Sequence, residues 1–163
     1  MSRRLPAEWE PHASTWVSWP HDRATWGDDF GAVQAASVQL VQALASADPQ
    51  VDVAVLDEEW EQRVHDQLAR VDAPRDRIRL HRIPTDDVWA RDHGPTVALD
   101  ASAHGGRVAV GWRFDAWGGK FPHGRDAAAG ALMAAASELP HEPSPITFEG
   151  GALETNGHGD LIT

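Results

Sequence analysis

Residues 51–56 read VDVAVL, and this short segment decides the fold class that the sequence predicts. Its apolar and polar residues alternate, which predicts a half-buried β-strand. Helical patterns flank it on both sides: Asp28 is expected to cap a helix that reaches residue 47, and Asp57 to cap a second helix. A strand between two helices indicates a mixed α/β or α+β fold.

The rest of the chain continues this mixed order. Strands are expected at residues 13–19, 77–83, 96–99, 107–114 and 146–148, and an alanine-rich helix at residues 125–139. Pro140, Pro143 and Pro145 indicate a linker. Asn156-Gly157 predicts a β-hairpin between residues 152–155 and 160–163. Because the chain stops inside that hairpin, we expect residues 1–163 to be a single domain that forms the N-terminal part of a larger catalytic domain.

The composition restricts the function classes. The formal net charge is −11, which argues against nucleic-acid binding and favours a cationic ligand, although such a charge also serves solubility alone. The chain has no cysteine, so disulfides, thiolate metal sites and a cysteine nucleophile are excluded within it. The nine histidines show no zinc spacing, and we expect no metal and no cofactor.

Targeting and membrane signals are also missing from the sequence. No apolar run approaches the roughly 18 residues that a membrane span needs. Residues 1–11 contain two arginines and no apolar signal core. We therefore expect a cytoplasmic protein without a membrane partner.

Residues 85–95, TDDVWARDHGP, carry the densest chemistry of the chain. They place three carboxylates around Trp89 and Arg91, namely Asp86, Asp87 and Asp92. Clustered carboxylates repel one another unless a cation lies among them, and an aromatic ring can stack on a planar cation. A guanidinium group fits this combination, because its planar donors match carboxylates bidentately. The alternative is a solvated acidic turn in which Arg91 pairs locally.

Two glycine-rich segments add weaker signals. Residues 114–120 read FDAWGGK, and residues 148–154 read FEGGALE, with Glu149 at the expected end of a strand. Paired glycines allow another segment or a ligand to approach closely. Taken alone, each segment is better explained as a packed loop or an exposed turn.

Together these segments resemble the agmatine deiminase and bacterial peptidyl-arginine deiminase family. The resemblance includes the opening PAEWEPH at residues 6–12, TWVSWPH at 15–21, DVWARDHGP at 87–95, DAWGGK at 115–120 and Glu149-Gly-Gly. It runs from about residue 5 to the last residue and covers about the first half of a family member. It implies a partial pentein α/β-propeller of about two and a half of five ββαβ-like units.

The resemblance also implies a chemistry, in which a cysteine thiolate attacks a guanidinium carbon and water then releases a urea. Asp92 would hold the guanidinium nitrogens, and Glu149 would lie against the catalytic histidine or the guanidinium. Asp86 would also line the site, while Trp89 and Trp117 would wall it. The expected partner is a small cationic guanidinium substrate, most simply agmatine, with peptidyl-arginine and free arginine as alternatives.

The nucleophile and the Gly-His-x-Asp block of the family are expected outside this sequence. His158 is not that histidine, because it falls in the hairpin after Glu149-Gly-Gly, where the family varies. By itself the chain is therefore expected to be inactive, and a non-catalytic guanidinium-binding module or a purely structural domain are the competing hypotheses. Open sheet edges and apolar faces also predict that this form self-associates.

Overall fold

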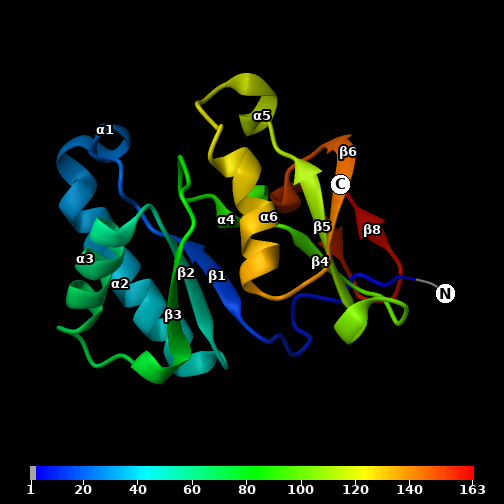
Figure 1. Ribbon diagram of the computed structural model, residues 1–163, viewed down its shortest axis with the longest axis horizontal. Coiled ribbons are helices and arrows are strands. Elements are labelled where there is room, and N and C mark those ends of the chain that lie inside the picture. The colour runs from blue at the N-terminus through cyan, green and yellow to red at the C-terminus, as the bar shows by residue number, and fades with distance from the viewer. Residues whose placement is uncertain (1–2) are drawn as a thin grey trace. The chain divides into compact units, whose positions relative to one another are not determined.

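A computed structural model describes residues 3–163, and they form two compact units. One unit contains residues 12–88; the other combines residues 89–163 with the N-terminal arm, residues 3–11. Both units pair β-strands with helices, which confirms the predicted mixed α/β class (Figure 1). In this described part of the chain, no helix is long and apolar enough to cross a membrane.

The unit of residues 12–88 is built on a three-stranded parallel sheet in the order β1-β2-β3. Its elements, in chain order, are β1 (Thr15–Ser18), α1 (Arg23–Trp26), η1 (Gly27–Asp29), α2 (Phe30–Ala47), β2 (Val51–Val55), α3 (Glu58–Leu68), η2 (Arg75–Arg77) and β3 (Ile78–Arg82). Right-handed crossovers between neighbouring parallel strands place successive helices on one face of a sheet. Accordingly α2 and α3 share a core with β2, made of Val38, Val41, Ala45, Val51, Val53, Val55, Val64 and Leu68, together with Trp19.

Three predictions for this unit can be compared with the structure. All five residues of β2 are buried, so the prediction of a half-buried strand was wrong. Parallel sheets are typically covered on both faces, and the central strand β2 buries Asp52 and Ala54 on one face as well as its three valines on the other. Asp57 does cap α3, accepting a hydrogen bond from the N–H of Trp60 at 3.0 Å. Asp28 does not cap α2, because it lies in η1 and the long helix begins only at Phe30.

The other unit contains a mixed sheet in the order β4-β5-β6 and a small hairpin of β7 and β8. Its elements are α4 (Ala90–His93), β4 (Thr96–Leu99), η3 (His104–Gly106), β5 (Arg107–Arg113), α5 (Ala116–Gly119), α6 (Asp126–Ala136), β6 (His141–Thr147), η4 (Gly150–Ala152), β7 (Glu154–Thr155) and β8 (Leu161–Ile162). Helix α6 connects the parallel strands β5 and β6 and buries Ala129, Met133 and Ala134. The predicted hairpin around Asn156-Gly157 is confirmed.

The predicted linker at Pro140, Pro143 and Pro145 was wrong, because residues 141–147 form β6. Proline cannot donate a backbone hydrogen bond, which excludes it from central strands but not from edge strands. Strand β6 is the edge of its sheet and pairs with β5 through a register shift between Gly111 and Arg113. The edge position explains how a proline-rich segment can be a strand.

Candidate functional site

The short helix α4 carries Asp92, the first residue predicted to bind a guanidinium. Backbone hydrogen bonds from Asp92 and His93 to the carbonyl oxygen of Trp89, at 2.9 and 3.1 Å, form its first turn. His93, the last residue of this helix, is buried, whereas Asp92 is half-buried. The fold therefore presents the Asp92 carboxylate from a turn that has a buried residue as its anchor.

The two glycines that follow Glu149 lie against α4. The backbone N–H of Gly151 donates a hydrogen bond to Oδ1 of Asp92 at 3.1 Å. A Cβ atom on Gly150 would lie 2.4 Å from the carbonyl oxygen of Arg91, and one on Gly151 would lie 2.1 Å from Oδ1 of Asp92. The contact at Gly150 is with backbone and requires glycine, whereas a side chain at Gly151 would push the Asp92 carboxylate out of its present position. The structure thus brings together the segments of two predicted catalytic residues, Asp92 and Glu149.

Trp89 and Trp117, the two predicted pocket walls, contact each other edge to face with ring centroids 6.0 Å apart. Trp117 also packs against the buried Phe114 at 5.4 Å and against the exposed Phe121 at 6.0 Å. Its backbone is left-handed, with φ of 57°, and the carboxylate of Asp115 accepts a hydrogen bond from Gly118 N–H within the same turn. Left-handed backbone in a bulky residue is uncommon and clusters at functional sites, which fits the role assigned to this loop.

Asp86 belongs to the other compact unit, residues 12–88. It follows β3 with a half-buried side chain, next to the buried Thr85. The neighbouring Asp87 accepts a hydrogen bond from the N–H of Val88 at 2.7 Å. The expected role of Asp86 in lining the site therefore remains a prediction.

One pocket lies elsewhere in the unit of Asp92. It encloses about 350 Å³ and is lined by residues of the N-terminal arm and the β7–β8 hairpin, namely Arg4, Ala7, Trp9, Glu10, Asn156, Gly157 and His158. No predicted site residue lines it, and its Arg4 and Glu10 are already paired with each other. We therefore place the candidate site at α4 and η4 rather than in this pocket. Across residues 3–163, no three side chains of His, Asp or Glu are grouped to hold a metal ion.

Comparison with known proteins identifies relatives of this chain. The sequence profile of the Porphyromonas-type peptidyl-arginine deiminases matches residues 4–163. The chain belongs to this family. Curated relatives include the agmatine deiminases of Pseudomonas fluorescens, 36% identical over 166 residues, and of Stutzerimonas stutzeri, 33% identical over 165 residues. Each alignment covers 98% of this chain but only 42% of the relative, so the chain spans less than half of their length.

The solved structures that resemble this chain include the agmatine deiminase of Enterococcus faecalis. It superposes with a TM-score of 0.84 at 27% sequence identity, covering 98% of this chain and 42% of that enzyme. The predicted resemblance and the mixed α/β fold are therefore confirmed. The number of propeller units stays a prediction.

The family's opening motif has a structural role that its residue pattern alone does not reveal. Its Glu8 accepts an ion-pair hydrogen bond from Arg91, 83 positions away, and its Glu10 pairs with Arg4. The alternative of a locally paired Arg91 was therefore wrong. The sequence offers no local signal for the pair of Glu8 and Arg91, because the two residues meet only through the path of the folded chain.

Proposed function

We propose that this chain supplies the guanidinium-binding carboxylates of a deiminase that converts a guanidine and water into a urea and ammonia. Agmatine is the preferred substrate, since the relatives named above are agmatine deiminases. The observation that carries the proposal is the fixed Asp92 carboxylate, which accepts a hydrogen bond from Gly151 beside the Glu149 segment.

The chemistry explains why carboxylates would matter in such a site. A guanidinium ion is a poor electrophile because its charge is delocalised over three nitrogens. Carboxylates that bind its N–H groups bidentately hold it in one orientation and favour the charged form. Asp92 would serve this role, Glu149 would bind a second N–H or the catalytic histidine, and Trp89 and Trp117 would cover the planar ion.

The covalent step needs a nucleophile that this chain does not contain, since it has no cysteine. In the reaction that we propose, a thiolate adds to the guanidinium carbon and ammonia leaves after receiving a proton. Water then adds to the same carbon and displaces the thiolate, which gives the urea. The chain alone should therefore bind substrate without releasing ammonia.

Isothermal titration calorimetry of the chain with agmatine tests the proposal. Putrescine is the matched control ligand, because it keeps the amine and the alkyl chain of agmatine and lacks the guanidine. Binding of agmatine with no binding of putrescine supports guanidinium recognition. Equal binding of the two ligands would show recognition of the amine rather than the guanidine, and no binding of agmatine would argue for a purely structural domain.

The second candidate substrate is peptidyl-arginine, which the description of the matching family favours. A peptide with an internal arginine, titrated beside agmatine and free arginine, separates the alternatives. Tighter binding of the peptide than of agmatine would shift the assignment to a peptidyl-arginine deiminase.

A further inference from the structure

Two sets of contacts hold the N-terminal arm, and the first set lies beside β4. The backbone of Arg4 exchanges two hydrogen bonds with Leu99, at 3.0 and 2.8 Å, and so forms an isolated β-bridge. The guanidinium of Arg3 binds the carboxylates of Asp100 at 2.8 Å and Glu142 at 2.7 Å. This bidentate arrangement fixes the beginning of the arm to the β4-β5-β6 sheet.

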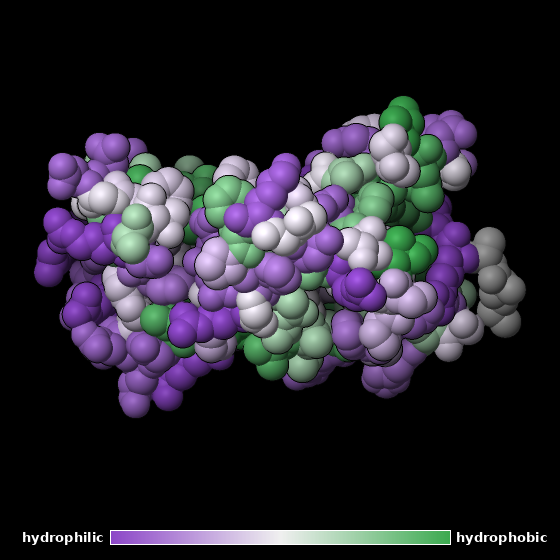
Figure 2. Space-filling view, turned by 90° about the horizontal axis from the view of Figure 1, so that it is seen from above, coloured by the Kyte–Doolittle hydropathy of each residue, from purple (hydrophilic) through white to green (hydrophobic). Residues whose placement is uncertain are grey.

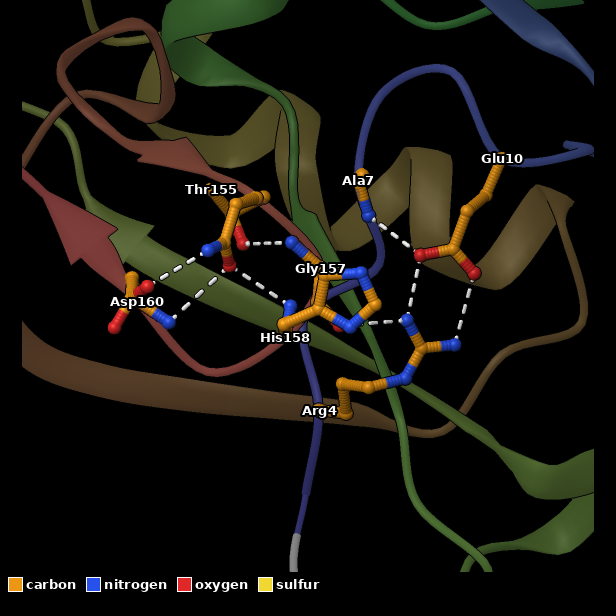
Figure 3. Close-up of polar contacts among 8 residues, drawn as sticks. Arg4, Ala7, Glu10, Thr155, Gly157, His158 and Asp160 are labelled. Carbon is orange, nitrogen blue, oxygen red and sulfur yellow. Dashed lines mark hydrogen bonds and ion pairs between the residues drawn. The ribbon is translucent and has the colours of Figure 1, made fainter.

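A second fastening holds the end of the arm against the β7–β8 hairpin, as Figure 3 shows. The guanidinium of Arg4 binds both carboxylate oxygens of Glu10, and it donates a further hydrogen bond to the carbonyl oxygen of Gly157 at 3.0 Å. Glu10 also accepts from the N–H of Ala7 at 2.8 Å. Gly157 has φ of 76°, and a Cβ atom there would lie 2.7 Å from Glu10, so the contact admits only glycine.

Glu8 lies between these two fastenings and pairs with Arg91 of α4. Arg91 is the residue before Asp92, and it touches the glycine segment in two ways. Its carbonyl oxygen faces Gly150. Its side-chain Cγ lies 3.3 Å from the point where a Cβ atom on Gly151 would be. One side chain therefore connects the arm to the segment that donates a hydrogen bond to Asp92.

We infer that Glu8 is a positioning residue for the candidate site, acting through Arg91 on the contact between Asp92 and Gly151. This inference rests on the proposed function, in which Asp92 holds the guanidinium. Helix α4 has only four residues, and so short a helix depends on tertiary contacts for its orientation. Glu8 supplies such a contact from an arm that is fixed at both ends.

The test replaces Glu8 by glutamine, which keeps the size of the side chain and removes its charge. Amide hydrogen exchange at Gly151, followed by NMR, reports the contact with Asp92 without any ligand. We expect exchange to become roughly two- to five-fold faster, as befits the loss of one exposed ion pair. Agmatine affinity, measured by calorimetry, should fall by a similar factor, while the urea midpoint of unfolding stays unchanged.

Two further variants separate positioning from general stability. Glu59→Gln removes a comparably exposed ion pair with Arg63 in the other unit and should leave Gly151 unaffected. Glu8→Asp keeps the charge and should restore part of the protection. Arg91→Lys, which retains one charge but not the forked geometry, should act like Glu8→Gln in weaker form.

The outcomes distinguish this inference from the proposed function. If Gly151 exchanges at the same rate in Glu8→Gln as in the unmodified chain, the positioning role is wrong whatever the chain binds. It is equally wrong if exchange quickens while agmatine binds both chains with equal affinity. If the unmodified chain binds no agmatine, the proposed function fails, and the Gly151 rate alone then decides whether Glu8 orders the contact.

Discussion

The backbone N–H of Gly151 donates a hydrogen bond to Oδ1 of Asp92 across 59 positions of sequence. The contact joins two motifs between which the chain forms the strands β4, β5 and β6. A carboxylate held by a backbone donor has fewer orientations to lose when it binds a cation. Under the proposed function, this hydrogen bond would hold the Asp92 carboxylate in place before a planar ligand binds.

Replacing Gly150 by alanine should destabilise the unit of residues 89–163. A methyl group there would lie 2.4 Å from the carbonyl oxygen of Arg91, and backbone atoms cannot move aside as a flexible side chain can. Overpacking of this kind costs about 1–3 kcal/mol of unfolding free energy. Urea denaturation followed by tryptophan fluorescence measures the loss.

Gly124→Ala is the matched control for this substitution. A Cβ atom at Gly124 would meet nothing within 4 Å, and this glycine lies in the same unit. We expect its unfolding free energy to change by less than about 0.5 kcal/mol. Equal stability of the two variants would show that η4 does not pack against α4 as described.

Asp92→Asn should weaken agmatine binding strongly without unfolding the chain. The amide retains the shape of the carboxylate and loses the charge that a guanidinium requires. Charge-assisted hydrogen bonds contribute roughly 1.5–3 kcal/mol, so the affinity should fall at least about tenfold. Calorimetry measures the affinity, and circular dichroism serves as the control for folding. Unchanged affinity would remove Asp92 from the site.

Much of this fold could be predicted because local chemistry and tertiary structure agree. Asp57 caps α3 as its side chain predicts, and Asn156-Gly157 turns the hairpin. The predictions failed where position within a sheet overrides local pattern. Strand β2 alternates as if half-exposed, yet it is central and fully buried, and β6 contains prolines that only an edge strand tolerates.

The candidate site could be predicted as a set of motifs but not as a geometry. The sequence marks Asp92 and Glu149-Gly-Gly, whereas only the fold shows that the glycines admit the backbone of α4. The pair of Glu8 and Arg91 depends on the path of the N-terminal arm, and no local pattern specifies a contact across 83 positions.

Acid should weaken the attachment of the N-terminal arm over a defined pH range. The guanidinium of Arg4, with help from the N–H of Ala7, lowers the pKa of Glu10 from 4.5 to about 2. A carboxylate whose pKa is lower in the folded state stabilises the fold fully above its ordinary pKa. That stabilisation is lost as the pH falls from about 4.5 to about 2. Urea midpoints measured across this range should therefore decline.

Glu10→Gln isolates the contribution of this one carboxylate. Other carboxylates titrate in the same range, among them Asp100, whose pKa is lowered to about 2 by the hydroxyl and N–H of Ser102 and by Arg3. The variant should be less stable than the unmodified chain near neutral pH, and the difference should shrink toward pH 2. A difference that is constant with pH would mean that the ion pair with Arg4 does not form.

The exposed sheet edges should cause the chain to self-associate. Among residues 3–163, strand β8 pairs only with β7, and it exposes Leu161 at 55% and Ile162 at 71%, while the edge strand β6 exposes Ile146. Hydrophobic residues also reach the surface on the face shown in Figure 2. Unpaired strand edges with apolar side chains favour pairing between chains.

Light scattering at increasing concentration should show a rising mean mass for the unmodified chain, and replacing Leu161 and Ile162 by lysine should lower it. Leu132→Lys, which alters an exposed leucine on α6 away from any strand edge, should leave the association intact. A monomer at every concentration, or equal effects of the edge and helix variants, would contradict association through the strand edges.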